Sequence, residues 1–237
     1  MIVIEATLFF SPHQDDETLS MGSAIIEHVE KSDTHVILCT DGSKSIIRKV
    51  LDDGGSCSYH IKDVHKYSLS ESDFSKNRDE EFKDSCKAMG VKENNIHIEN
   101  NRAHDGELSK EKSREIILKY LEKYPDAKVK TVTPYKALGI HEDHRALGEA
   151  ALELYKEGKI KDLRFYVEPY DYNDFKKVNP NVRVWKVLSS QEEKLLSAMD
   201  AYKKWNPEKG NYAIGYHSVK SHFDELKSNK IQYVHAP

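Results

Sequence analysis

Two clusters of histidine and acidic residues are the features of this sequence best suited to chemistry. They read His13-Gln14-Asp15-Asp16-Glu17 and His141-Glu142-Asp143-His144. His13 and Asp16 are three residues apart, so both side chains can face one ion from a single turn. The two histidines of the second cluster repeat that spacing. Two histidines and one carboxylate, with a fourth position left open, are the usual ligands of a catalytic zinc ion, and the pattern predicts such a site.

The acids of the first cluster also have a purely structural explanation. Acidic residues at the start of a helix are stabilised by the helix dipole, which would account for residues 15–17. A single His-x-x-Asp pair would also be weak evidence, since the chain has 12 histidines and 40 acidic residues. Neither argument explains two such clusters, each following a predicted strand, so we favour the metal site.

The elements that must position these clusters follow from short apolar runs that alternate with segments of helical period. Strands are predicted at residues 6–10, 35–40, 95–98, 129–133 and 164–167, with an edge strand at 182–187. Helices are predicted at residues 19–29, 77–89, 109–124 and 147–155, and a capping box at 190–193 precedes a C-terminal helix. Strands joined through helices imply a Rossmann-like three-layer α/β/α sandwich with a mainly parallel sheet.

This architecture brings the two clusters together. In an open parallel sheet, ligands bind at the carboxyl ends of the strands. The first cluster follows the strand at 6–10, and the second follows the strand at 129–133 after a short loop. We therefore expect both clusters at the same edge of the sheet.

Length and composition narrow the functional classes. The 237 residues fit one large α/β domain, and we expect residues 1–237 to form it. A formal charge of −4 argues against a nucleic-acid partner, because such surfaces are strongly basic. The three cysteines, at 39, 57 and 86, form no CxxC pair, which indicates reduced thiols in a cytoplasmic protein. No run approaches the roughly 20 apolar residues of a membrane span, so we expect no transmembrane segment.

Three further motifs accompany the clusters. They are Thr40-Asp41-Gly42, then Arg78-Asp79-Glu80-Glu81 followed by Ala88-Met89-Gly90-Val91, and finally His104-Asp105-Gly106-Glu107-Leu108. Together with the clusters, they resemble the PIG-L/LmbE-like superfamily of metal-dependent N-deacetylases over residues 6–150. That family includes enzymes that deacetylate N-acetylglucosaminyl lipids and thiol-precursor glycosides. Gln14 and Glu142 stand where many members have proline, but neither is an expected ligand.

The resemblance implies a role for each residue of the clusters. The implied zinc ligands are His13, Asp16 and His144. The same ligand set also suits iron(II), so the sequence leaves the metal open. Asp15 would be the general base, and His141 the electrophilic or acidic partner, oriented by Asp143. Arg78 and Asp105 would bind substrate, although a paired surface arginine and an ordinary Asp-Gly turn would also explain them.

The chemistry agrees with these roles. Zinc would polarise the acyl carbonyl and lower the pKa of its bound water toward about 7. Asp15 can take the proton of that water as it attacks, and His141 can stabilise the resulting oxyanion together with zinc. The leaving amine needs a proton from one of these two residues, and the sequence does not choose between them.

The implied substrate is a small N-acetylated sugar or glycoconjugate, and family members often form homo-oligomers. The main alternative is a non-catalytic Rossmann-like module that binds a nucleotide or sugar. Such a module would need a glycine-rich phosphate loop after the first strand. The first turn carries acids instead, which would repel a phosphate, so we favour the deacetylase.

Two regions are harder to interpret. The polar segment at 48–76 is long for a connection, which suits a lid, a binding loop or a disordered segment. Aromatic residues near the C-terminus could stack on a sugar ring, but core packing or a subunit contact explains them better. These aromatic residues are Tyr202, Trp205, Tyr212 and Tyr216.

Overall fold

A computed structural model describes residues 5–52, 67–135 and 141–237 of the chain. Its main sheet has seven strands in the order β3-β2-β1-β4-β5-β9-β6. In chain order they are β1 (Ala6–Ser11), β2 (Asp33–Thr40), β3 (Ile96–Ala103), β4 (Lys128–Val132), β5 (Leu163–Val167), β6 (Arg183–Lys186) and β9 (Ile231–His235). The strands from β3 to β5 pair in parallel, whereas β9 runs antiparallel to both neighbours. The predicted mainly parallel sheet is confirmed.

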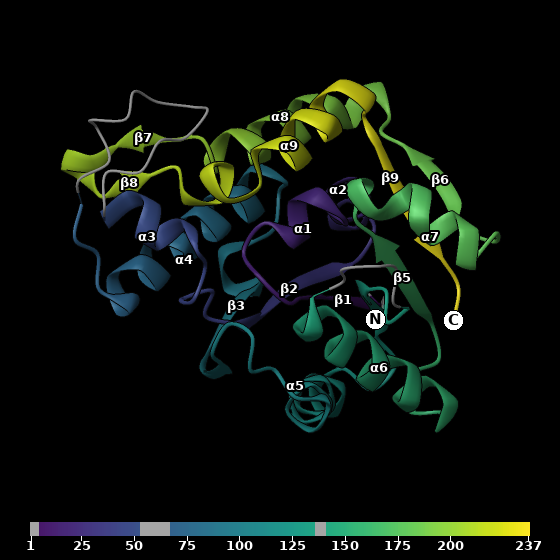
Figure 1. Cartoon of the computed structure of the whole chain (residues 1–237). Helices are drawn as coiled ribbons and strands as arrows, with labels where there is room; N and C mark the ends of the chain where they lie inside the picture. The colour runs from purple at the N-terminus through teal and green to yellow at the C-terminus, as the bar shows by residue number, and fades with distance from the viewer. Residues whose placement is uncertain (1–4, 53–66, 136–140) are drawn as a thin grey trace.

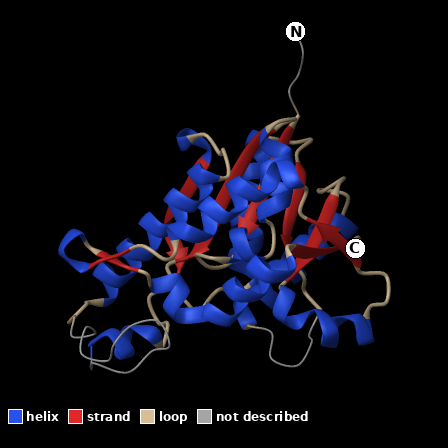
Figure 2. Cartoon of the chain, turned by 90° about the horizontal axis from the view of Figure 1, so that it is seen from above, coloured by secondary structure: helices blue, strands red, loops and turns tan. Residues whose placement is uncertain are grey.

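Helices connect these strands (Figures 1 and 2). The α-helices are α1 (Asp16–Leu19), α2 (Gly22–Val29), α3 (Ile47–Asp52), α4 (Glu71–Ala88), α5 (Lys110–Lys123), α6 (Glu142–Lys156), α7 (Tyr172–Val178), α8 (Ser189–Ala201) and α9 (Ile214–Asn229). Three short 3-10 helices are η2 (Glu93–Asn95), η3 (Pro169–Asp171) and η4 (Pro207–Lys209). A small hairpin joins β7 (Trp205–Asn206) to β8 (Asn211–Tyr212).

Side chains of β1 alternate between two buried faces of the sheet. Phe9 packs into a core with residues of α2, α4, α8 and α9. Leu8 and Phe10 pack into a second core with residues of α5 and α6. Figure 1 shows these two helical layers on either side of the strands. Burial on both faces explains why the central strands β1 and β2 contain continuous apolar runs, and the predicted three-layer α/β architecture is confirmed.

The helix predicted at residues 19–29 is divided into α1 and α2. Gln232 of β9 reaches into the break between them. Its Nε2 donates to the carbonyls of Thr18 and Leu19 at 2.8 and 2.9 Å, and its Oε1 accepts from the N–H of Ser23 at 2.8 Å. A buried side chain from far along the chain therefore satisfies backbone groups at both helix ends, which local periodicity cannot reveal.

Other expectations hold with small changes. The edge strand predicted at 182–187 is β6, the last strand of the sheet. The expected C-terminal helix after the capping box is α8, but its N-cap is Leu188, whose N–H donates to Gln191 Oε1 at 3.1 Å. The ends of the polar segment at 48–76 are helical, while residues 53–66, including Cys57, lie outside the described residues. No helix within the described residues is long and apolar enough to cross a membrane.

Candidate active site

The two clusters meet at the carboxyl edge of the sheet. His13 and Asp16 follow β1, and His144 lies in the first turn of α6, after the neighbouring strand β4. His13 Nδ1 lies 3.1 Å from His144 Nε2 and 3.3 Å from Asp16 Oδ2. His144 Nε2 lies 3.1 Å from the same oxygen of Asp16. Three donor atoms therefore converge on one point, and we call these side chains the ligand triad.

The ligand triad has the spacing of a metal site. Ligand atoms about 2.0–2.2 Å from a tetrahedral zinc ion lie about 3.3–3.6 Å from one another. The separations of 3.1, 3.1 and 3.3 Å in the triad are close to those values. All three residues are buried, with exposed fractions of 8, 2 and 7 % for His13, Asp16 and His144. The donor types and their geometry fit a divalent cation with room for a further ligand.

Gly148 explains how α6 brings His144 to this point. A Cβ atom at position 148 would lie 2.6 Å from the backbone nitrogen of Pro134 and 2.9 Å from the carbonyl oxygen of Val132. No side chain fits in that space. Glycine therefore allows the helix to pack directly on the end of β4, with His144 one turn earlier beside the loop after β1.

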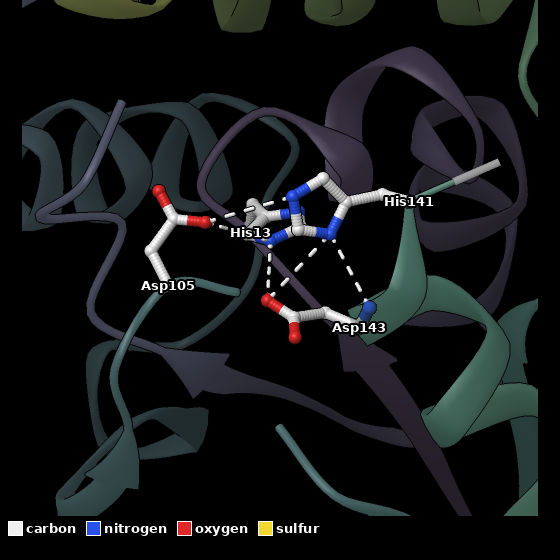
Figure 3. Close-up of side chains that lie close together, drawn as sticks. All are labelled: His13, Asp105, His141 and Asp143. Carbon is white, nitrogen blue, oxygen red and sulfur yellow. Dashed lines mark hydrogen bonds and ion pairs between the residues drawn. The ribbon is translucent and has the colours of Figure 1, made fainter. Parts of the chain in front are cut away.

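Asp143 fixes the orientation of His13. His13 Nε2 lies 3.0 Å from Asp143 Oδ2 (Figure 3). The Asp143 carboxylate also accepts from the N–H groups of Gly106 and Leu108 at 2.7 and 2.9 Å. With its proton on Nε2, His13 presents the lone pair of Nδ1 to the triad. The family resemblance implied that Asp143 orients His141. In the structure the Asp143 carboxylate lies 3.7 Å from His141 Nδ1, which accepts instead from the Asp143 backbone N–H at 3.2 Å.

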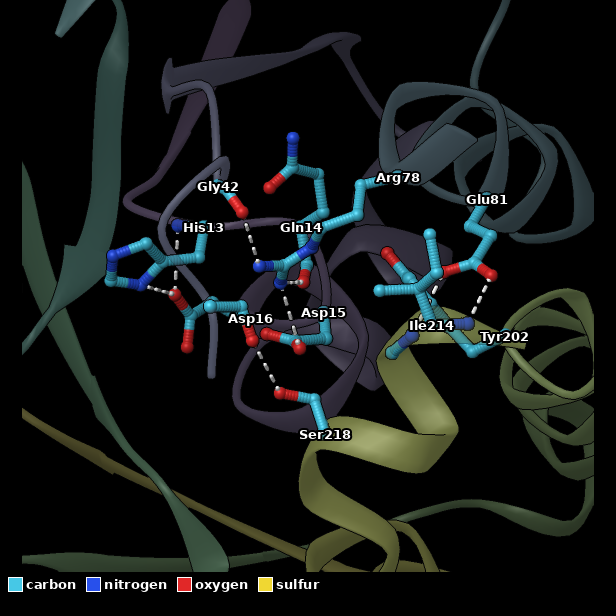
Figure 4. Close-up of polar contacts among 12 residues, drawn as sticks. His13, Gln14, Asp15, Asp16, Gly42, Arg78, Glu81, Tyr202, Ile214 and Ser218 are labelled. Atoms are coloured by element: carbon cyan, nitrogen blue, oxygen red, sulfur yellow. Dashed lines mark hydrogen bonds and ion pairs between the residues drawn. The ribbon is translucent and has the colours of Figure 1, made fainter. Parts of the chain in front are cut away.

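Asp15 lies beside the triad in an unusual backbone conformation, with φ of 120°. Arg78 is buried against this turn and donates to the carbonyl oxygens of Gln14 and Gly42 at 2.7 and 3.2 Å. Its Nη2 also lies 3.3 Å from Asp15 Oδ2 (Figure 4). Arg78 therefore contacts the expected base and its loop directly, and is not the solvent-exposed residue that its helix alone would suggest.

The surroundings shift the pKa values of these groups in different directions. Burial raises the pKa of Asp15 well above its usual value, although the charge of Arg78 opposes that shift. Burial acts in the same direction on Asp16, but the charge of His144 and hydrogen bonds from the histidines hold its pKa well below the usual value. The pKa values of the two adjacent aspartates therefore shift in opposite directions. This difference suits Asp16 as a ligand and Asp15 as a proton acceptor.

His141 and Asp105 complete this side of the site. His141 is 45 % exposed, and its Nε2 lies 3.8 Å from Asp105 Oδ1, which is also 3.4 Å from His13 Nε2. Burial and the nearby charges of His13 and His144 lower the pKa of His141. Together with His13 and Asp143 these residues form a second group of potential metal ligands. We prefer the ligand triad, because the Asp143 carboxylate already accepts three hydrogen bonds.

A pocket of about 460 Å³ opens onto these residues. All eight predicted site residues except Asp143 line it, and Asp143 lies directly behind. The pocket is also lined by residues that the sequence analysis missed, namely Lys44, Glu168, Tyr170, Asp171, Ser218 and His222. Glu168 directly follows β5, and ligands bind at the carboxyl ends of parallel strands, so its position in the sequence could have identified it. No comparable sequence signal marks His222, which reaches the pocket from α9.

Comparisons with known proteins agree with this geometry. Residues 8–155 match the family model PIG-L, described as GlcNAc-PI de-N-acetylase. The fold is similar to that of the zinc-inhibited form of teicoplanin deacetylase Orf2, with 16 % identity, a TM-score of 0.64 and coverage of 97 % of this chain and 96 % of that chain. A comparison with curated protein sequences gives no match.

Two further solved structures share the fold. N,N'-diacetylchitobiose deacetylase from Pyrococcus horikoshii is 18 % identical, with a TM-score of 0.60 and coverage of 98 % and 84 % of the two chains. The 4-carboxy-2-hydroxymuconate hydratase GalB from Pseudomonas putida is 14 % identical, with a TM-score of 0.60 and coverage of 98 % and 95 %. The fold thus occurs in deacetylases and in a hydratase, so activity must be argued from the site.

Proposed function

The chain belongs to the PIG-L family of de-N-acetylases, as its motifs predicted, and we propose that it is a zinc-dependent N-deacetylase. Its substrate would be an N-acetylglucosamine-like sugar or sugar conjugate. The observation that carries this proposal is the convergence of the ligand triad beside the buried carboxylate of Asp15. The description of the family model and the diacetylchitobiose deacetylase of similar fold support a sugar amide as the substrate class.

The residues of the site can share the work of amide hydrolysis. The ligand triad would hold the zinc ion, which would polarise the acetamide carbonyl and activate water for attack. Asp15 faces the same pocket, and its carboxylate would take the proton of the attacking water. Arg78 favours the ionised form of Asp15 and holds the backbone of its loop. We therefore assign Arg78 to positioning the base, and Asp105, on the pocket wall, to contact with substrate.

His141 is suited to stabilise the oxyanion. Its Nδ1 accepts a hydrogen bond from the Asp143 backbone, so the neutral ring carries its proton on Nε2. That N–H would donate to the oxygen of the tetrahedral intermediate. With His141 engaged in this way, the proton taken up by Asp15 would pass to the leaving amine. The carbon–nitrogen bond then breaks, releasing acetate and the amino sugar.

The decisive experiment combines metal analysis with an assay of amine release. Protein purified without chelator should contain about one zinc or iron ion per chain. It should release amine from at least one sugar in a panel of N-acetylated monosaccharides, disaccharides and glycolipids. Chelation should abolish the release, and re-addition of zinc or of iron(II) should identify the working metal. Metal-loaded protein that binds sugars but cleaves no amide in the panel would instead support the non-catalytic binding module.

A further inference from the structure

The pocket is lined in part by a pair of stacked rings, those of Tyr170 and His222. Tyr170 lies in η3, directly after β5, and His222 lies in α9. Their ring centroids are 4.6 Å apart and the ring planes are inclined by only 17°. Tyr170 is 63 % exposed although it is stacked on His222, so most of its surface remains open to solvent at the pocket.

Glu168 lies between this ring pair and the ligand triad. His222 Nδ1 lies 3.5 Å from Glu168 Oε2, and the other oxygen of Glu168 lies 3.8 Å from Nδ1 of the ligand His144. The helix that carries His222 is itself interrupted at Val219, where φ and ψ are −135° and 46°. Residues on both sides of this kink line the pocket, as irregular helical geometry often does at functional sites. The ring pair therefore lies close to the ligand triad.

We propose that Tyr170 and His222 form a platform that binds the pyranose ring of the substrate; this inference rests on the proposed function. A pyranose has one face of C–H groups, which packs well on an aromatic ring, and an equatorial rim of hydroxyls. The carboxylates of Glu168 and Asp171 lie beside the platform and can accept hydrogen bonds from that rim. A pocket of about 460 Å³ has room for a single sugar between the platform and the ligand triad.

Binding of a deacetylated sugar tests the platform without turnover. Isothermal titration and saturation-transfer NMR would measure binding of methyl β-glucosaminide to the zinc-loaded protein. Tyr170→Ala should weaken binding by about 3- to 10-fold, whereas Tyr170→Phe, which keeps the ring, should bind like wild type. Tyr155→Ala is a matched control, since Tyr155 is 38 % exposed on α6 and does not line the pocket.

The outcomes separate this proposal from the proposed function. Equal affinities of wild type and Tyr170→Ala would overturn the platform, as would no binding by wild type. Binding that depends on Tyr170, in a protein that cleaves no N-acetyl sugar, would support the platform and contradict the deacetylase.

A second, independent observation concerns how Asp15 is held. Its positive φ of 120° is rare for any residue except glycine, and such conformations persist only where the surroundings impose them. Its N–H donates to Glu17 Oε2 at 3.0 Å. The other oxygen of Glu17 accepts from the hydroxyls of Thr18, Ser85 and Tyr202 at 2.7, 3.0 and 2.6 Å.

Glu17 and Tyr202 are both fully buried. A Cβ atom on Gly215 would lie 2.4 Å from the Tyr202 ring, so the phenol is packed closely in its place. A buried carboxylate stabilises a core less well than an apolar side chain of similar size, which argues that this one is retained for its hydrogen bonds. We infer that Glu17 and Tyr202 are positioning residues that hold Asp15 in its strained conformation for the proposed proton transfer.

Two substitutions distinguish positioning from simple packing. Glu17→Met removes the acceptor but keeps the volume, whereas Glu17→Gln keeps an oxygen that can accept from the Asp15 N–H. Hydrogen exchange of the Asp15 amide should accelerate at least 10-fold in Glu17→Met and remain near wild type in Glu17→Gln. Turnover per bound zinc should fall in the first variant at unchanged KM and recover in the second. Unchanged exchange and turnover in Glu17→Met, with only a lower melting temperature, would overturn the inference.

Discussion

Two regions of this molecule combine a pair of histidines with an aspartate, at opposite ends of the parallel strands. The ligand triad lies at the carboxyl edge, where its three donor atoms converge. Near the amino ends of β2 and β3, His35 Nε2 lies 3.1 Å from Asp33 Oδ2, and His35 Nδ1 lies 3.0 Å from His97 Nε2. The second group is a chain of contacts and has no common point.

The difference lies in what each ring nitrogen is used for. Both ring nitrogens of His35 contact protein side chains, and its ring stacks on that of His97 with 5.3 Å between the ring centroids. His13 uses one nitrogen for Asp143 and directs the other toward the triad. Identical residue types thus give a structural contact in one place and a candidate metal centre in the other. The orientation that the fold imposes on each histidine ring decides between these two outcomes.

The largest expected effect is on metal content. Alanine at His13, Asp16 or His144 should leave a folded chain with much less than one bound divalent ion, because two ligands hold the ion poorly. Alanine at His35 or His97 should leave the metal content at the wild-type level. Elemental analysis, with circular dichroism to confirm folding, checks both groups. Stoichiometric zinc in the triad variants, or its loss from the His97 variant, would break the comparison.

A smaller effect should distinguish the neighbouring acids. Asp15→Asn should keep the metal and lose about 10²- to 10⁴-fold in turnover, since the amide cannot accept a proton from water. Asp16→Asn should lose the metal as well. Turnover and zinc content should be measured on both variants. Loss of zinc from Asp15→Asn, with zinc retained in Asp16→Asn, would exchange the two roles.

His141 should affect rate without affecting the metal. Loss of one oxyanion donor typically lowers turnover by about 10²- to 10³-fold, which we expect for His141→Ala with full zinc and near-normal melting. Lost zinc would instead identify His141 as a further ligand. Normal turnover on a confirmed substrate would rule out the proposed role.

The smallest effect concerns stability at low pH. Burial, together with the charge of His35, lowers the pKa of His97 to about 4. Its unfolded value is near 6.5, so the unfolded state takes up a proton first as the pH falls between these values. His97 should therefore weaken folding by at most about 1.4 kcal/mol per pH unit in that range, and have no such effect above it. Urea unfolding of His97→Gln should show a shallower decline than wild type between pH 6.5 and 4; parallel curves would contradict this.

Much of the architecture could be predicted because it is local. Apolar runs mark the central strands β1 and β2, and the carboxyl ends of β1 and β4 locate the two clusters at one edge of the sheet. The individual members of the ligand triad came from the family resemblance. Tertiary contacts determined the rest. The break between α1 and α2 depends on Gln232, and the wall of the pocket depends on a kink at Val219. The partner of Asp143 depends on side-chain directions that residue spacing does not specify.

The position of β9 in the sheet determines which parts of the fold can form while the chain is still being synthesised. This strand lies between β5 and β6, so within the described residues β6 has no partner strand until residues 231–235 have left the ribosome. The same strand carries Gln232, which joins the ends of α1 and α2 next to Asp16 of the ligand triad. Long-range pairing of this kind forms late in folding. A nascent chain arrested before residue 231 should therefore hold β1 to β5 with an incompletely ordered ligand triad, and synthesis of β9 should complete the sheet and the triad together.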